Sequence, residues 1–359
     1  MALVLRSVDK NGKVIERFVE VQHVPDTTSN TLKESIDAFI HFNELSFSNL
    51  RGQCYDGVSN MKGEFNGLKT KILNDQPCAF YVHCFAHQLQ LALVAVAKDN
   101  VDVNTFFLLA NNVVNNIGAS SNRLLKDIQS FEFVFLLFLM KSILGITNDL
   151  SQALQNDDQE IVNVMALVNT CEEQLLYMRN YEGFDLLLTK LNDRFNETST
   201  ELLICLASLS PNDSFAAFDK EKLLCLAQLY PQDFTKQDLL ALEDQLDIYI
   251  HYMRSRSDFS QLQSISDLAK KMVEKRLHQV FQYVYLLIEL ALVLPVATAS
   301  MERAFSAMNI IKSSLRNRMG DQWLNDSLVV YIVKYVFSCI DNETIMTRFQ
   351  SMRSHHGQI

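Results

Sequence analysis

The stretch at residues 2–24, ALVLRSVDKNGKVIERFVEVQHV, decides how the fold begins. Two runs rich in apolar residues, at 2–8 and 13–24, flank the tetrapeptide Asp9-Lys10-Asn11-Gly12. Asn-Gly between two such runs indicates a tight turn, because both residues tolerate a positive φ. The sequence therefore predicts an N-terminal β-hairpin.

The residues after the hairpin predict alternating helices and strands. Capping oxygens at 26–29 precede apolar residues at helical spacing, which indicates a helix. Short apolar runs then predict strands at 53–55 and 79–84, and longer ones predict helices at 65–73 and 87–97. The expected order is strand, strand, helix, strand, helix, strand, helix.

From about residue 101 onward the pattern is helical almost throughout. Apolar residues recur at i, i+3, i+4 and i+7, and Pro211, Pro231 and Pro295 interrupt them. Helices are expected at 133–154, 160–178, 201–209, 220–229, 236–253 and 262–294. The predicted fold class is α+β and helix-rich, with a large helical portion.

Composition limits the functions that this chain can have. With 359 residues, 48% of them hydrophobic, it can bury a large core, and two subdomains are expected. A formal net charge of -10 makes general nucleic-acid binding unfavourable, because phosphate contacts rely on clustered Lys and Arg. Any DNA contact would be local.

Two observations indicate an intracellular protein. The longest uninterrupted apolar runs, at 133–140 and 290–296, are too short to span a bilayer, so no membrane partner is expected. Residues 1–6 lack the basic segment of a signal peptide. The cysteines are scattered, several on apolar helical stripes, and we expect free thiols in a reducing compartment. They are Cys54, Cys78, Cys84, Cys171, Cys205, Cys225 and Cys339.

Three separated motifs resemble the core of hAT-superfamily transposases. They are LRGQCYDGVSNMKG at 50–63, HCFAH at 83–87 and ASMERAFS at 299–306. The resemblance is greatest to plant proteins called zinc finger MYM-type protein 1-like. It implies an incomplete ribonuclease H-like sheet, whose first strand would precede Met1. That strand is central in the family, so we expect a rearranged sheet in which the remaining strands pair directly, or a partner that fills the gap.

The resemblance also implies a site for two divalent ions, held by carboxylates on two strands and a later helix. Asp56 matches the family's second acidic residue and Glu302 its third. The first would lie on the absent strand. Neither Asp9, in the hairpin turn, nor Asp26, at a helix start, replaces it. Taken alone, Asp56 is a turn residue before Gly57, and Glu302 is a surface residue.

We therefore interpret Asp56 and Glu302 as vestigial and expect no nuclease or transposase activity. No cofactor is expected, and Mg²⁺ or Mn²⁺ would bind only if the ancestral site is functional. The alternative is a residual hAT-type transposase with metal-dependent DNA binding and strand transfer. A carboxylate within coordination distance of both residues would favour that alternative.

Cys84 and His87 form a C-x-x-H pair that could supply two zinc ligands. A closed structural zinc site needs four, and no second pair is present. His83 is expected to point to the opposite face of its strand. Packing and hydrogen bonding at the strand-to-helix junction is therefore the favoured role of this motif.

The region at 294–336, LPVATASMERAFSAMNIIKSSLRNRMGDQWLNDSLVVYIVKYV, resembles the hAT C-terminal dimerisation region. Its apolar residues form two helical stripes, which would bury an interface between subunits or close the protein's own core. The predicted dimerisation residues are Phe305, Met308, Ile311, Leu315, Trp323, Leu328 and Tyr331. The second stripe also includes Leu324 and Ile332. A basic cluster could contact nucleic acid or form ion pairs; it comprises Arg303, Lys312, Arg316 and Arg318.

The resemblance divides the chain into three parts. Residues 1–120 would be a partial ribonuclease H-like domain, 121–255 a helical remnant of the family insertion, and 256–350 the dimerisation region. The family's upstream zinc-binding DNA-recognition module is absent, and the insertion is shortened after residues 121–123. The expected partner is a second copy or a related hAT-derived protein, and the family favours the nucleus over the cytoplasm.

Overall fold

A computed structural model gives the structure of the protein. It describes residues 1–55, 57, 59–63, 65–115, 126–156, 159–177, 189, 201–312 and 319–351. The chain divides into two compact units, which are treated separately below. The terminal unit comprises Met1–Leu5, Glu16–Pro25 and Ser300–Ile359, and the central unit comprises Arg6–Ile15 and Asp26–Ala299. The three-part division by ancestry stays a prediction.

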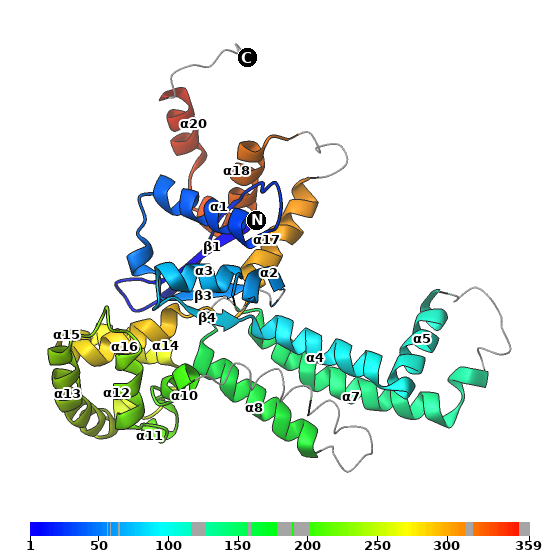
Figure 1. Cartoon of the computed structure of the whole chain (residues 1–359), viewed down its shortest axis with the longest axis horizontal. Coiled ribbons are helices and arrows are strands. Elements are labelled where there is room, and N and C mark those ends of the chain that lie inside the picture. Colours follow the sequence, from blue (N-terminus) through cyan, green and yellow to red (C-terminus); the bar gives the residue numbers. More distant parts are fainter. Residues whose placement is uncertain are drawn as a thin grey trace. The chain divides into compact units, whose positions relative to one another are not determined.

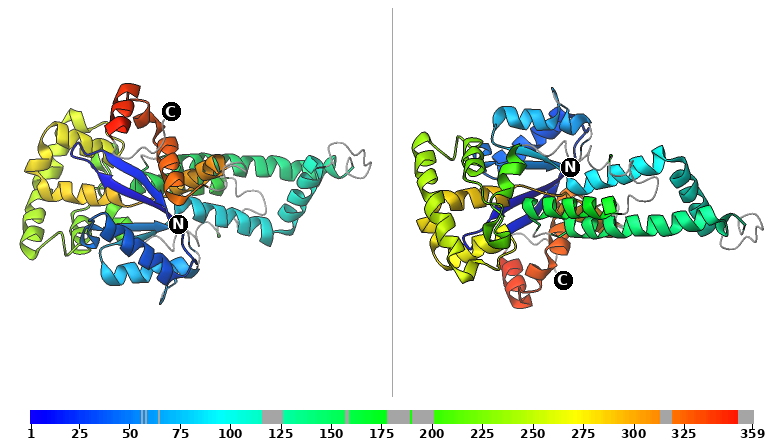
Figure 2. Two further views of the ribbon diagram at one scale, coloured as in Figure 1. Left: turned by 90° about the horizontal axis from the view of Figure 1, so that it is seen from above. Right: turned by 90° about the horizontal axis from the view of Figure 1, so that it is seen from below.

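The predicted N-terminal hairpin is confirmed. Strands β1 (Ala2–Val8) and β2 (Val14–Val21) form a two-stranded sheet, drawn in dark blue in Figure 2. The Asp9 carboxylate accepts hydrogen bonds from the backbone N–H groups of Asn11 and Lys13, at 2.8 and 2.9 Å, and shapes the turn. Gly12 has a φ of 75°, as the Asn-Gly signal predicts. The second strand ends at Val21, before Val24.

Helix α1 follows as predicted and leads to a second sheet in the central unit. The hydroxyl of Thr28 caps α1 (Ser29–Phe42). After a 3-10 turn, η1 (Phe47–Asn49), strand β3 (Gly52–Tyr55) pairs in parallel with β4 (Phe80–His83). Both strands match the predicted ones.

The helices that connect and follow these strands differ in part from the prediction. The connection contains α2 (Ser59–Lys62) and α3 (Leu68–Asp75). Helix α3 begins three residues later than predicted because Gly67 is its N-cap, in extended backbone. Helix α4 (Phe85–Asp99) starts directly after β4.

The sheet does not rearrange by direct pairing of the hairpin with β3. The described strands form two separate sheets, β1-β2 and β3-β4, so this expectation was wrong. One reason lies at the hairpin turn, where a Cβ on Gly12 would be only 2.9 Å from the backbone carbon of Ala269. The turn therefore packs against a helix instead of a strand. A partner that fills the gap stays a prediction.

The rest of the central unit is helical. Helices α4, α7 and α8 run side by side, and α10 to α16 form a second cluster (Figure 1). The helices are α5 (Val101–Asn115), α7 (Phe131–Leu154), α8 (Ile161–Tyr177), α10 (Glu201–Ala207), α11 (Asn212–Phe215), α12 (Lys220–Gln228), α13 (Lys236–Arg254), η3 (Ser257–Phe259), α14 (Ile265–Glu274), α15 (Leu277–Val280) and α16 (Gln282–Val293).

The long helix predicted at 262–294 is three helices. Arg276 adopts a left-handed conformation, with a φ of 58°, and ends the run after α14. Apolar spacing continues across this break, because all three segments pack on one core. Periodicity alone therefore could not locate the break.

The length of helix α7 contradicts the expectation that every apolar segment is too short to span a bilayer. It has 24 residues and, by length and composition, is apolar enough to cross a membrane. The uninterrupted apolar run ends before Lys141, but the helix and its apolar character continue beyond that residue. Only 22% of its most apolar window is buried, and this criterion is also met by some helices of soluble proteins.

The terminal unit has a small core of its own. It combines Met1–Leu5 and Glu16–Pro25, which contain the outer parts of both hairpin strands, with α17 (Ala299–Ile311), α18 (Asp321–Ile332), α19 (Lys334–Phe337) and α20 (Asn342–Ser351). Phe18 of β2 packs in a cluster with helix residues from α17 and α18. These are Ala304, Ala307, Ile311, Leu324 and Leu328. Helix α20 buries none of its residues.

Candidate functional site

Of the two carboxylates predicted for a metal site, the structure describes only Glu302. Strand β3 ends at Tyr55, one residue before Asp56, and Asp56 itself lies outside the described residues. Glu302 lies in the first turn of α17 and is exposed. Within the described ranges, no group of three or more His, Cys, Asp or Glu side chains could hold a metal ion. The vestigial role of both carboxylates stays a prediction.

A buried hydrogen-bond network fixes the end of β3. The Tyr55 hydroxyl donates to the side-chain oxygen of Gln53 at 2.6 Å, and the Gln53 amide donates to the carbonyl of Ala79 at 2.8 Å. The Tyr81 hydroxyl donates to the Tyr55 carbonyl at 3.1 Å. Burial raises the pKa of the Tyr55 phenol. The strand is therefore held rigidly up to the residue before Asp56.

Cys84 is fully buried at the junction between β4 and α4, where it is the N-cap residue. Its sulfur lies 3.2 Å from the hydroxyl oxygen of Thr298 and accepts a hydrogen bond from the Thr298 backbone N–H at 3.4 Å. Hydrogen bonds from Cys54 first, and then from Thr298, lower the pKa of the Cys84 thiol to about 6 despite its burial. Cys84 thus has the packing and hydrogen bonding expected at this junction.

His83 lies on the face of the sheet that carries Tyr55 and Tyr81. It pairs with Tyr55 across the two strands, and its ring stacks on that of Tyr81, with centroids 6.2 Å apart. The rings of His83 and His87 have centroids 5.9 Å apart. The expected orientation of His83, opposite to Cys84, stays a prediction.

The structure separates the predicted dimerisation residues into two groups. Ile311 and Leu328 are buried in the core of the terminal unit, and Met308 packs against that core. Phe305, Trp323 and Tyr331 are exposed, with 42%, 72% and 46% of their surface accessible. Leu315 lies outside the described residues. The first group closes the protein's own core, and the second remains available for a partner.

More apolar side chains are exposed on α18, α19 and α20 than the two predicted stripes include. On α20 they recur at i, i+1 and i+4 and share one helix face. The exposed side chains are Val330 on α18, Tyr335, Val336 and Phe337 on α19, Ile340 between α19 and α20, and Ile345, Met346 and Phe349 on α20. In the sequence, the apolar residues of 342–351 at helical spacing could have indicated this face, and in the structure α20 buries none of them.

Two members of the basic cluster are exposed, Arg303 on α17 and Lys312 just after it. Arg303 donates to the hydroxyl of Ser300 at 3.1 Å, and Ser300 in turn donates to the carboxylate of Glu16. Lys312 follows the end of the helix. Arg316 and Arg318 lie outside the described residues.

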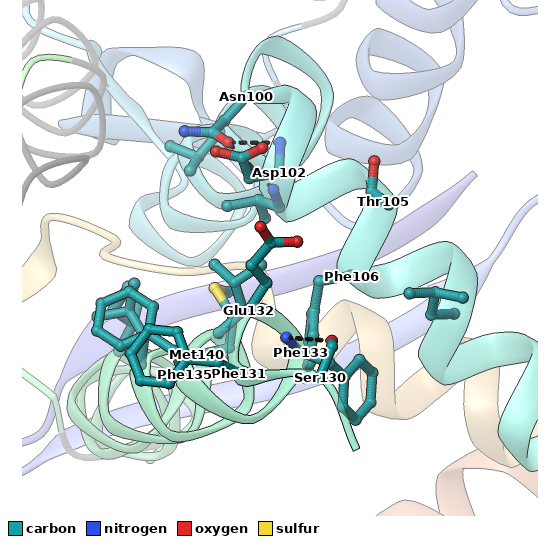
Figure 3. A pocket seen from close by; sticks show the side chains of 16 residues that line it. Asn100, Asp102, Thr105, Phe106, Ser130, Phe131, Glu132, Phe133, Phe135 and Met140 are labelled. Carbon is teal, nitrogen blue, oxygen red and sulfur yellow. Dashed lines mark hydrogen bonds between the residues drawn. The ribbon is translucent and has the colours of Figure 1, made fainter. Parts of the chain in front are cut away.

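An apolar groove between α4, α5 and α7 was not predicted from the sequence. It encloses about 500 Å³, and Phe106, Phe133 and Met140 project into it (Figure 3). Asn100 caps α5 and Ser130 caps α7 at its rim. Phe131, which also lines the groove, and Phe138 are exposed on α7, at 83% and 64%. The all-round apolar composition of α7 is the sequence signal for this region.

Residues 1–67 match the family DUF4371, described as "ZMYM1/FAM200, RNase-like domain". The match covers the hairpin, α1, β3 and the segment that contains Asp56. The N-terminal region is therefore similar to a transposase-derived, ribonuclease-like domain, and the match supports a ribonuclease H-like origin for the incomplete sheet. It also supports the descent of this region from a transposase-derived family.

Proposed function

We propose that the protein acts through association with a second copy of itself, by means of helices α17 to α20, and that it does not cleave or join DNA. The observation that carries this proposal is the exposure of large apolar side chains along these helices. Trp323 is 72% exposed and Tyr335 69%, and α20 buries nothing. Such surfaces mark interaction sites when they are rimmed by polar residues.

The faces of α17 and α18 support this role. Leu324 and Leu328 of α18 face the unit's own core, whereas Trp323 and Val330, seven residues apart, share an outward face. On α17, Ala307 and Ile311 are buried while Phe305 and Ile310 are exposed. The outward apolar groups are the kind that form the centre of an interface. The resemblance of this region to the hAT dimerisation region favours a second copy as the partner.

The absence of catalysis is part of the proposal, in line with the expectation that Asp56 and Glu302 are vestigial. The alternative is a residual hAT-type transposase, and the exposure of Glu302 on α17 is the observation that favours it. Metal-dependent DNA cleavage with Mg²⁺ or Mn²⁺, abolished by Asp56→Ala, would replace our proposal with that alternative.

Association is tested by the mass of the full chain in solution, measured by light scattering at micromolar concentration. We expect a dimer for the unmodified protein and a monomer for Trp323→Ser combined with Tyr331→Ser. Circular dichroism should be unchanged, since both side chains are exposed. The control is Phe138→Ser, an exposed apolar residue on α7. A monomeric unmodified protein, or loss of the dimer only in the control, would contradict the proposal.

A further inference from the structure

We propose that the groove between α4, α5 and α7 binds a small single-chain amphiphile with a cationic head group. The alkyl chain would lie along the floor of the groove, and the head group would lie at its rim. The groove belongs to the central unit and involves none of α17 to α20, so this site is independent of the proposed association.

The floor of the groove reaches the hydrophobic core. Five of the side chains that line it are at most 7% exposed and belong to the main cluster of buried residues. They are Val96, Val103, Phe106, Met140 and Ile143. None of these side chains carries a nitrogen or oxygen atom that could hold a water molecule, and space with such a lining favours apolar ligands. The floor therefore suits an alkyl chain.

The size of the groove fits a small molecule. Its volume of about 500 Å³ lies within the range of roughly 300–1,000 Å³ that is usual for small-molecule sites, which are mostly apolar with a few polar groups. Leu136 and Leu139 of α7 line it and are half-buried, whereas Phe131 lines it and is 83% exposed. The lining thus changes from buried at the floor to exposed at the rim, as the two ends of an amphiphile require.

The rim of the groove carries a net negative charge. Asp102 lies in the first turn of α5 and Glu132 in the first turn of α7, and both side chains are exposed. Figure 3 shows Glu132 projecting from α7 towards the start of α5. Each helix N-terminus is equivalent to about half a positive charge. The two carboxylates therefore outweigh the two N-termini by about one charge.

No cation in the described part of the chain neutralises this rim. None of the described residues that line the groove is Lys, Arg or His. Neither Asp102 nor Glu132 forms an ion pair with a described residue. The side-chain oxygens of Asn100 and Ser130 already accept backbone N–H groups as helix caps, whereas the two carboxylates can accept further hydrogen bonds. An ammonium group has three donors and the complementary charge, so an amine suits this rim and a carboxylate does not.

The experiment is a calorimetric titration of the full-length chain at pH 7 with decylamine, decanoate and octylamine, each below its critical micelle concentration. Decylamine is cationic at this pH. We expect it to bind at one site per chain and about tenfold or more tightly than decanoate, which has a similar alkyl chain and the opposite charge. Octylamine should bind several-fold more weakly than decylamine, because each buried methylene changes the affinity by about fourfold.

A pair of exposed substitutions tests the head group. Asp102→Asn combined with Glu132→Gln should abolish the preference for decylamine over decanoate and leave circular dichroism unchanged. The control is Asp149→Asn combined with Glu173→Gln, which makes the same change in net charge at exposed positions outside the groove and should keep the preference. Equal affinity of the unmodified chain for decylamine and decanoate would overturn the proposal, as would equal effects of the two double variants.

A second pair of variants tests where the alkyl chain lies. Leu136→Trp enlarges a side chain that lines the groove and should weaken the binding of both amines by about tenfold, whereas Leu137→Trp, at an exposed position outside it, should not. Decylamine binding that Leu136→Trp leaves unchanged would place the ligand elsewhere and overturn the proposal. So would binding to phosphatidylcholine vesicles without saturable binding of decylamine, which would assign the exposed phenylalanines of α7 to a membrane surface. If Leu136→Trp does not fold, the two double variants carry the test.

Discussion

The side-chain amide of Asn325 exchanges two hydrogen bonds with the backbone of Val21. Its oxygen accepts from the Val21 N–H at 2.8 Å, and its nitrogen donates to the Val21 carbonyl at 3.1 Å. The neighbouring Gln22 exchanges both backbone bonds with Met1. The backbone groups of consecutive strand residues point to opposite edges of the strand. Those of Gln22 point towards β1, so those of Val21 point away from it. Asn325 therefore covers the edge of β2 that faces away from β1.

Asn325→Leu should destabilise the terminal unit. The variant is close in size, but it leaves both polar groups of Val21 without these partners, at a cost of about 1–3 kcal/mol. The measurement is the free energy of unfolding from urea denaturation, followed at Trp323. Asn309→Leu, at an exposed position of α17, is the control and should change it by less than about 0.5 kcal/mol. An equal effect of both variants would contradict the role of Asn325.

Two glycines should respond in opposite directions to alanine. Gly12→Ala should destabilise by about 1–3 kcal/mol, because its φ is 75° and the new Cβ would lie 2.9 Å from backbone of Ala269. Gly145→Ala, within α7, meets nothing within 4 Å and should stabilise by about 0.5–1 kcal/mol through helix propensity. Thermal unfolding of the two variants and the unmodified chain measures both changes: the melting temperature should fall for Gly12→Ala and rise for Gly145→Ala. Destabilisation by both would show that Gly145 has a role beyond α7.

The paired hydrogen bonds between Arg51 and Asp233 connect the start of β3 with the turn before α13. Arg51 donates to both carboxylate oxygens, at 2.6 and 2.7 Å, and the pair is mostly buried. Arg51→Lys should cost about 2–3 kcal/mol, since a lysine cannot reproduce the planar fork. Lys270→Ala removes an exposed pair with Asp267 and should change stability by less than about 1 kcal/mol. The free energies of unfolding of both variants are measured in urea. Similar losses of stability in the two variants would contradict the larger effect expected for Arg51→Lys.

The central unit should lose stability as pH rises towards neutrality, because of Glu160. This carboxyl accepts hydrogen bonds from the N–H groups of Ile265 and Ser266 at the start of α14. Burial raises its pKa from 4.5 to about 7, although these two N–H groups and Arg6 act in the opposite direction. The folded state then holds a proton that the unfolded state has released.

A raised carboxyl pKa contributes stability that is complete below pH 4.5 and is lost as pH rises through about 7. The loss is on the order of 3 kcal/mol, because a tenfold change in proton affinity corresponds to about 1.4 kcal/mol. Glu160→Gln should flatten this dependence in urea unfolding at pH 5 and pH 8. A slope between these pH values that is the same in the variant would show that Glu160 is not responsible.

Local signals predicted most of the N-terminal fold, and long-range contacts could not be predicted. Asn-Gly at 11–12 located the hairpin, and Thr28 located the start of α1, because turns and caps depend on neighbouring residues. The pairing of β3 with β4 depends on register, and the hydrogen bond from Asn325 joins residues 304 apart. No spacing rule reports such contacts.

The candidate site shows the same limit. The motif around Cys84 could be located in the sequence, but its contacts with Thr298 and Cys54 depend on the assembled sheet. Apolar spacing identified Ile311 and Phe305 together as one stripe, although the first is buried and the second exposed. A pattern identifies an apolar helix face, and only packing decides whether it faces inward or outward.

The terminal unit contains both the first and the last residues of the chain, and this has a consequence for the order of folding during synthesis. Phe18 leaves the ribosome early, whereas its partners Leu324 and Leu328 are made about 300 residues later. At about 5–20 residues per second, that interval is roughly 15–60 s. During this time Phe18 has no helix of the terminal unit to cover it, so we expect the nascent chain to expose this apolar side chain until α18 has emerged.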